Sequence, residues 1–328
     1  MNPNLFWLIT AILLAFLGRA EAQQPTKIPR IGFVSAVGSA KAPGPHLGAF
    51  RQGLRDLGYA EGKNIVFELR YVEGRSDRVP SLVAELVQLK VDVLVLRSQP
   101  AILAAKEATK TIPIVISTTQ DSVAAGFVDS LARPGGNITG VTTLQRELSG
   151  KRLELLKEVV PGVSRVAALA SAIQAKTDFK LYEAPARALK LELQLIKIEV
   201  PKPDLDAAFL AAAKGHANAL ITVAGSVLNR PDTRKRIAEL AIETSLPSMH
   251  ESSDFVEGGG LLSYASDEAE SFRRVAYYVD KILKGAKPGD LPVEQAKKFE
   301  LTINLKTAKQ IGLTIPPNVL ARADKVIK

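Results

Sequence analysis

The sequence contains no cysteine, and this absence excludes several kinds of site and anchor. No disulfide can form, so we expect the burial of a hydrophobic core alone to hold the fold together. No lipid can be attached through a cysteine. A metal site would have to use histidine and carboxylate ligands, and the three histidines, His46, His216 and His250, do not have the spacing of a ligand set.

Signatures of nucleotide use, hydrolysis and nucleic-acid binding are also missing. The chain has no Walker motif, and the stretch around Ser226, AGSVL, lacks the two glycines of a nucleophile elbow. The formal net charge is +9, but 43 Lys and Arg residues are spread among 34 Asp and Glu residues without a basic block. We therefore predict a protein that is not an enzyme, needs no cofactor or metal and binds no nucleic acid.

Only one long hydrophobic run is present, from Leu5 to Gly18. It is short for a membrane span and is followed by Ala20-Glu21-Ala22, which has the small residues of a cleavage site. We predict a signal peptide over residues 1–22 and export to the periplasm. No Lys or Arg precedes the run, so an uncleaved membrane anchor remains the alternative.

Beyond this segment, short β-rich runs alternate with amphipathic runs of helical period. The first half predicts strands within 28–36, 64–72, 91–98, 112–118 and 137–143. Helices are expected between them over 46–59, 77–89, 100–109 and 122–131. This alternation is typical of a parallel sheet with helices on both faces.

The same alternation starts again at residue 148. It predicts helices over 148–160, 179–189, 204–214 and 230–243, with strands over 165–171, 191–200, 218–225, 246–250 and 259–266. A strongly periodic helix over 268–285, a strand over 298–305 and two short helices ending at Lys328 complete the chain. The predicted fold class is α/β, with two doubly wound parallel-sheet lobes.

The stretch ARPGGNITG, residues 132–140, has two possible meanings. A Gly-Gly pair in a basic turn is compatible with a phosphate-binding loop or with a passage between two lobes. A phosphate-binding loop follows a strand and opens a helix, because it presents helix N-terminal N–H groups to the phosphate. Here we expect Gly135 and Gly136 to end a helix and open a strand, which favours the passage between lobes.

Several long segments resemble the ABC-transporter substrate-binding proteins of the tryptophan/tyrosine-binding type. They are GAFRQGLRDLGYAEGKNIVFELRY, SLARPGGNITG, LSGKRLELLKEVVPGVSRVA, YVDKILKGAKPGDLPVEQ and KFELTINLKTAKQIGLTIPP, and they occur in one order after residue 29. The resemblance implies a type I periplasmic-binding fold, in which three crossovers join two lobes and the ligand is held in the cleft between them.

The resemblance also implies how the chain is shared between the lobes. The first lobe would comprise 30–142 with a return segment over 266–296, and the second 143–265 with 297–328. The hinge would lie near Gly140–Thr143, Tyr264–Asp267 and Glu294–Phe299.

Ligands of open parallel α/β sheets bind beyond the carboxyl ends of the strands. In the first lobe this rule selects Ser35, Ser98, Gln99, Pro100, Thr118, Thr119, Asp121 and Ser122. In the second lobe it selects Ser171, Ala172, Ile173, Gln174, Gly225, Ser226, His250, Glu251 and Ser252, and Asp267 lies at a crossover. For the first-lobe hydroxyls, capping of the residue's own helix is an equal alternative to ligand contact.

One departure from the related proteins concerns the ligand's ammonium group. Amino-acid-binding members tend to have a carboxylate or Asn near the segment that is ALITVA here, whereas this chain continues with Ala224-Gly225-Ser226. Asp121, Glu251 or Asp267 is a possible replacement, but a solvated loop charge is the favoured interpretation of each. An α-amino acid is therefore one candidate solute beside an organic acid.

The resulting prediction is a monomeric periplasmic binding protein that delivers a small polar or aromatic solute to a permease. The permease would lie in the inner membrane with a separate ATPase chain. The alternative is a periplasmic sensor protein whose ligand-bound form is recognised by a receptor or kinase. A third interpretation is a secreted α/β enzyme, but we find no set of catalytic residues for it.

Overall fold

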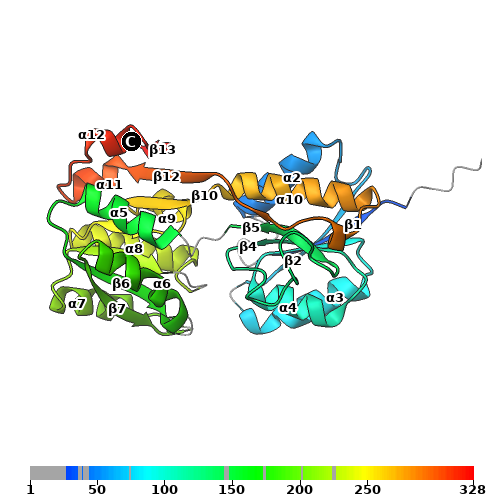
Figure 1. The fold of residues 1–328 in the computed structure, drawn as a ribbon, viewed down its shortest axis with the longest axis horizontal. Coiled ribbons are helices and arrows are strands. Elements are labelled where there is room, and N and C mark those ends of the chain that lie inside the picture. The colour runs from blue at the N-terminus through cyan, green and yellow to red at the C-terminus, as the bar shows by residue number, and fades with distance from the viewer. Residues whose placement is uncertain are drawn as a thin grey trace, which may run out of the picture.

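The computed structural model describes the chain from residue 27 onward, with short gaps. The described ranges are 27–35, 39, 44–73, 75–143, 148–172, 175–200, 202–223 and 227–328. They form two lobes, each with its own sheet and its own covering helices (Figure 1). The predicted signal segment and its cleavage site lie outside the described ranges.

The sheet of the first lobe has the strand order β11-β5-β4-β3-β1-β2. All of its strand pairs are parallel. The strands are β1 (Arg30–Ser35), β2 (Val66–Tyr71), β3 (Val93–Leu96), β4 (Ile114–Thr118), β5 (Ile138–Thr142) and β11 (Glu294–Gln295). The central strands β3 and β4 are buried throughout, because an uninterrupted apolar run suits a sheet that helices cover on both faces.

Two helix pairs cover the faces of this sheet. On one face α2 (Pro45–Asp56) packs against α10 (Glu268–Leu283), and their apolar sides share one core with β1 and β3. On the other face α3 (Val79–Gln88), which follows the short helix η1 (Ser76–Arg78), packs against α4 (Gln99–Ala108). A helix from late in the sequence therefore completes the first lobe.

The sheet of the second lobe has the order β13-β12-β10-β9-β8-β6-β7. Its strands are β6 (Arg165–Ser171), β7 (Glu192–Ile198), β8 (Ala219–Val223), β9 (Ser248–His250), β10 (Leu262–Ser266), β12 (Phe299–Asn304) and β13 (Lys325–Ile327). Only the β10–β12 pair is antiparallel among the described strands, since β12 enters from the first lobe while β10 leaves toward it.

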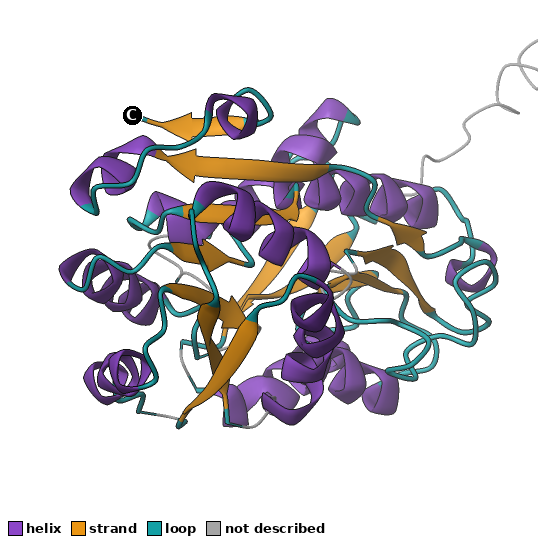
Figure 2. Cartoon of the chain, turned by 60° about the vertical axis from the view of Figure 1, so that its left-hand side comes forward, coloured by secondary structure: helices purple, strands orange, loops and turns teal. Residues whose placement is uncertain are grey.

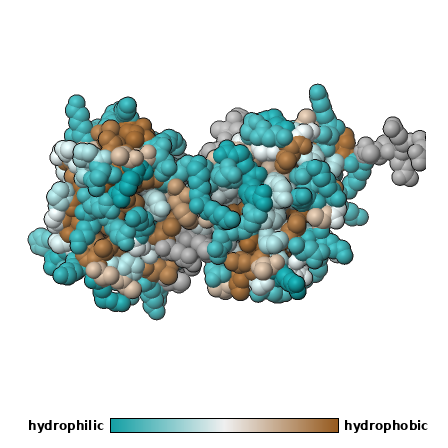
Figure 3. Space-filling view, turned by 45° about the horizontal axis from the view of Figure 1, so that its top comes forward, coloured by the Kyte–Doolittle hydropathy of each residue, from teal (hydrophilic) through white to brown (hydrophobic). Residues whose placement is uncertain are grey.

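Helices cover both faces of this second sheet as well. One core contains α5 (Ser149–Val159) and α6 (Ala175–Ala188), together with the short α11 (Leu305–Gln310) and α12 (Pro317–Leu320). The other contains α7 (Leu205–Lys214), α8 (Pro231–Glu243) and the short α9 (Ser253–Glu257). Figure 2 shows the helices on either side of each sheet. In the space-filling view of Figure 3, a waist separates the two rounded lobes.

The predicted helix over residues 122–131 is wrong, because this segment is a series of turns. The carboxylate of Asp121 accepts hydrogen bonds from the N–H groups of Val123 and Ala124, at 2.9 and 3.1 Å. Gly126 then takes a positive φ of 69°, which ends any helical path. Local side-chain bonds of this kind compete with a helix and here they win.

The predicted carboxyl end is also partly wrong. The two short helices exist as α11 and α12, but Lys325–Ile327 forms the strand β13 and pairs with β12. This pairing is a contact between segments far apart in the chain, which a local pattern does not reveal.

The glycine pair of ARPGGNITG leads directly into β5, as predicted. It does not end a helix, since turns precede it, and that part of the prediction is wrong. Gly135 has a φ of +83°, and a Cβ there would lie 2.3 Å from the Asp129 carboxylate. The pair shapes a tight turn before a strand, and no helix follows it that would present N–H groups to a phosphate.

The chain passes between the two sheets at three places. The first passage is between β5 and α5, the second is at Asp267 between β10 and α10, and the third, 296–298, lies between β11 and β12. Hydrogen bonds join them, from Ala296 N–H to Thr142 O at 2.8 Å and from Asp267 N–H to Lys298 O at 3.1 Å. The passages coincide with the three segments expected to act as the hinge; that they bend stays a prediction.

Candidate functional site

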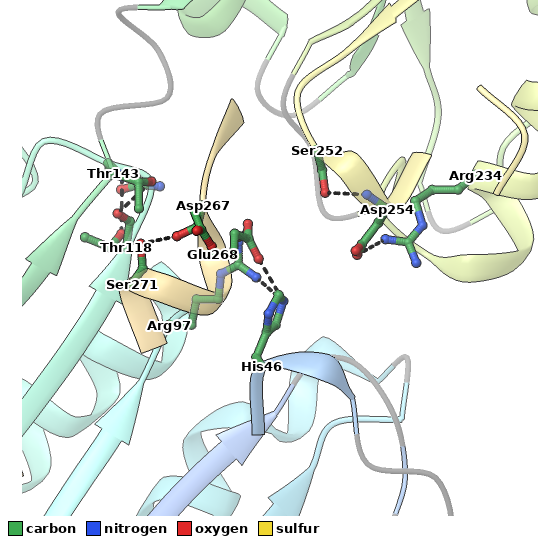
Figure 4. A network of polar contacts seen from close by, with 11 residues as sticks. His46, Arg97, Thr118, Thr143, Arg234, Ser252, Asp254, Asp267, Glu268 and Ser271 are labelled. Atoms are coloured by element: carbon green, nitrogen blue, oxygen red, sulfur yellow. Dashed lines mark hydrogen bonds and ion pairs between the residues drawn. The ribbon is translucent and has the colours of Figure 1, made fainter. Parts of the chain in front are cut away.

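Polar side chains of the two lobes face each other where the carboxyl ends of the strands meet (Figure 4). His46, Arg97 and Glu268 form the first-lobe group. Ser252, Asp254 and Arg234 form the second-lobe group. Of these six residues, only Ser252 was selected from the carboxyl ends of the strands, although the others in both groups include direct neighbours of selected residues.

The first-lobe group joins three separate elements. His46 lies in the first turn of α2, Arg97 directly follows β3, and Glu268 is the first residue of α10. The Arg97 guanidinium donates to His46 Nε2 at 2.5 Å and to the carboxylate of Glu268. The His46 ring stacks on Phe272, with centroids 5.0 Å apart. Burial and the adjacent Arg97 charge lower the pKa of His46 to about 4, so the ring is neutral at pH 7.

The second-lobe group is held by two helices. Ser252 caps α9 by accepting a hydrogen bond from the Asp254 N–H at 3.3 Å. Arg234, one turn into α8, donates through Nη1 to the Asp254 carboxylate. Each lobe therefore presents one arginine and one carboxylate that are already paired within that lobe.

The residues predicted for the first lobe gather at one edge of its sheet. Gln120 Nε2 donates to Gln99 Oε1 at 2.9 Å, and the Gln120 N–H donates to Thr118 Oγ1 at 3.3 Å, so the ends of β3 and β4 are joined. Ser98 is the N-cap of α4 in an extended conformation, but its side chain makes no capping bond to the described residues. The capping alternative thus leaves the Ser98 hydroxyl unexplained.

The other first-lobe candidates differ in exposure. Ser35 and Thr119 are half-buried, and Pro100 is exposed. The Asp121 carboxylate is occupied by the turn that follows it. Ser122 is fully buried, and in the described part of the chain its hydroxyl has no hydrogen-bond partner.

The predicted second-lobe residues are less well placed. Ile173, Gln174, Gly225 and Ser226 lie outside the described residues. Ser171 is buried at the end of β6. Asp267 caps α10 by accepting from the Glu270 N–H at 2.9 Å and also accepts from Lys298 Nζ at 2.9 Å.

Glu251 belongs to a buried network rather than to an open surface. Tyr182 Oη donates to Glu251 Oε1 at 2.7 Å, and Arg152 Nη1 contacts the same oxygen at 3.2 Å. Arg152 Nε donates to the Tyr264 carbonyl at 2.8 Å, two residues before the end of β10. Arg152 thus connects α5, the strand leading to the second passage, and Glu251 at the end of β9.

Comparison with known proteins gives the family. The sequence profile of the ABC transporter substrate binding proteins matches residues 39–327. This chain belongs to that family. A curated relative, the tyrosine-binding protein of Clostridioides difficile (strain R20291), is 24% identical over 265 residues, which are 80% of this chain and 75% of the relative.

Solved structures of similar proteins have the same two-lobed fold. A conserved domain protein from Vibrio cholerae is 30% identical, with a TM-score of 0.81, over 92% of this substrate-binding protein and all of the other chain. An ABC domain from Streptococcus pneumoniae in complex with L-Trp is 25% identical, with a TM-score of 0.78, over 91% and 99% of the two chains. The fold is the type I periplasmic-binding fold.

The described part of this substrate-binding protein includes no helix with the length and apolar character needed to cross a membrane. Within the same residues, no three His, Asp or Glu side chains come together as a possible metal site.

His250 lies inside the second lobe of this substrate-binding protein. Its ring is fully buried and stacks on Phe255, with centroids 4.5 Å apart. Nδ1 lies 3.2 Å from the Thr222 hydroxyl and Nε2 lies 3.0 Å from the Ser248 hydroxyl. Both ring nitrogens are therefore occupied, and the ring does not reach the surface between the lobes.

The buried His250 predicts that stability falls on mild acidification. Burial lowers the pKa of His250 from 6.5 to about 3. Between these two pH values His250 is protonated in the unfolded chain but neutral in the folded chain, so acidification favours unfolding. The contribution is complete above about pH 6.5 and is lost as the pH falls toward about 3. Urea unfolding between pH 7.5 and 5 should show the decline, and His250→Gln should reduce its slope relative to a His216→Asn control. An unchanged slope in His250→Gln would contradict this role.

The selection of residues at the carboxyl ends of strands missed five residues of Figure 4 for identifiable reasons: Arg97, Glu268, Arg234, Asp254 and His46. Arg97 stands next to the selected Ser98, and Glu268 stands next to the selected Asp267, so extending each window by one residue would have included both. Arg234, Asp254 and His46 lie within helices rather than directly after strands. No local sequence signal marks these three.

Proposed function

We propose that this chain is the solute-capturing component of an ABC importer in the periplasm. It acts as a monomer that encloses a small polar or aromatic solute, either amino-acid-like or an organic acid, and delivers it to a permease served by a separate ATPase. The observation that carries this proposal is that the polar groups of the two lobes face each other beside three passages that are joined by hydrogen bonds. Such an arrangement suits closure around a ligand.

The relatives support an aromatic solute as the first to test. One is named a tyrosine-binding protein, and another was solved in complex with L-Trp. In this chain the start of α4 supplies a suitable anchor for a carboxylate. Ser98 is its N-cap residue and Gln99 its first residue, Gln120 donates to the Gln99 side chain, and helix N-termini stabilise anions.

The proposal is tested by binding and by shape. L-Tryptophan, L-tyrosine and benzoate should be titrated calorimetrically into the chain, and a solute that binds should raise the unfolding free energy by about 2.7 kcal/mol at 100 times its Kd. The same solute should lower the radius of gyration in solution X-ray scattering. Binding without compaction, or chemical turnover of the solute, would contradict the proposal.

Ser98→Ala should weaken solute binding by about 1–3 kcal/mol, because a buried polar group of the ligand would lose its partner. Its thermal stability should change little, since Ser98 makes no capping bond to the described residues. Ser81→Ala is the matched control, because Ser81 is an exposed serine on α3 whose hydroxyl donates to the Arg78 carbonyl. Equal affinities of the two variants would remove Ser98 from the pocket.

A further inference from the structure

The hydrogen bonds around His46 leave one oxygen of Glu268 without a donor from that ring. A guanidinium is always protonated, so the 2.5 Å contact from Arg97 makes His46 Nε2 an acceptor. Glu268 Oε2 lies 3.1 Å from this same Nε2. Two acceptors cannot hydrogen-bond to each other. Glu268 Oε2 therefore has the capacity for a donor that His46 does not provide.

The second-lobe group has the opposite deficiency, a hydrogen-bond donor that lacks an acceptor among the described residues. Arg234 uses Nη1 for Asp254, and its side chain is only 13% exposed. Its Nε–H is buried and finds no acceptor within the described residues. A buried donor without a partner is costly, so an arrangement that supplies an acceptor is favoured.

The two deficient groups face each other between the lobes (Figure 4). Burial is the main cause of the low pKa of His46, but the second-lobe charges also act on it. Asp254 raises this pKa and Arg234 lowers it. Charges of the second lobe therefore lie within electrostatic range of the first-lobe group even before any closure.

We propose that Arg234 of the second lobe pairs with Glu268 of the first lobe when the lobes close. The guanidinium supplies the donor that Glu268 Oε2 lacks, and the carboxylate supplies an acceptor to the guanidinium. Because Glu268 is the residue after the second passage, the pair forms beside the hinge and stabilises the closed form. If the pair is lost, a smaller fraction of the molecules is closed and the solute binds more weakly. This consequence rests on the proposed function.

Cross-linking tests the contact without relying on a solute. Since the chain has no cysteine, Arg234→Cys with Glu268→Cys places the only two thiols in the protein. A short bis-maleimide should join them, as detected by mass spectrometry after digestion. The control pair is Arg236→Cys with Glu268→Cys, because Arg236 lies on the same helix but pairs with Asp206 and Glu243 on the outer surface. Equal yields in the two pairs would overturn the proposal.

A double-mutant cycle tests the energetic consequence, with L-tryptophan as the probe. Glu268→Gln and Arg234→Met should each raise its Kd about tenfold, and the double variant should be no weaker than the weaker single variant. If Arg234 instead held an anionic group of the solute, the two losses would multiply to about a hundredfold, and the proposal would be overturned. Circular dichroism of each variant without solute shows whether it is folded.

The two proposals fail in different ways. Selective cross-linking with no binding of any tested solute would leave the ion pair standing and refute the solute-binding role. Binding with compaction, but with cross-linking no better than in the Arg236 control, would refute the ion pair and leave the solute-binding role standing.

Discussion

Replacing Arg152 by methionine should lower the free energy of unfolding by about 3–5 kcal/mol. The Arg152 side chain is 1% exposed, and it donates to the Tyr264 carbonyl and contacts Tyr182 and Glu251. Methionine fills a similar volume but leaves the Glu251 carboxylate without its buried counter-charge. Removal of one partner from a buried ion pair costs more than the pair itself contributes, because the remaining charge stays desolvated.

Urea unfolding of Arg152→Met beside Arg165→Met measures this effect. Arg165 also pairs with a glutamate, Glu192, at 2.8 Å, but its side chain is 43% exposed. We expect the control to lose no more than about 1 kcal/mol, as exposed ion pairs do. Similar losses in both variants would show that Arg152 is not a buried anchor of the second lobe.

Gly140→Ala should destabilise the first lobe by about 4 kcal/mol or more, which places it among the severe single substitutions. Gly140 has a φ of +140° and pairs with Ile116 in the neighbouring strand. A Cβ there would lie 2.1 Å from Ile116 O and 2.6 Å from Ile116 N, both backbone atoms. The methyl group would have to force β4 and β5 apart. The strain would arise two residues before Thr142, whose carbonyl accepts the hydrogen bond from Ala296 of the third passage.

Gly136→Ala is the matched control for this prediction. It lies in the same ARPGGNITG stretch, but an added Cβ would have no heavy atom within 4 Å. We expect its stability to remain within about 0.5 kcal/mol of the unmodified protein in chemical denaturation. A Gly140→Ala protein as stable as this control would show that β4 and β5 tolerate separation.

The regular elements were predictable because their signals are local. The apolar runs VLVL and IVIST identify central strands of a covered sheet, and the period of residues 268–285 identifies α10. The prediction failed where local and distant interactions competed. The Asp121 carboxylate and Gly126 convert an expected helix into turns, and β13 exists only because β12 offers it an edge.

The sequence by itself determined that polar residues follow the strands of two largely parallel sheets, since an alternation of strands and helices indicates parallel strands whose carboxyl ends share one edge. Which of these residues are available was decided only by the tertiary structure. Glu251 is bound by Arg152, 99 residues earlier, and Glu268 is bound by Arg97, 171 residues earlier. The physical reason is that ion pairs and burial depend on distance in space, and helix α10 reaches the first lobe only after the chain has built most of the second.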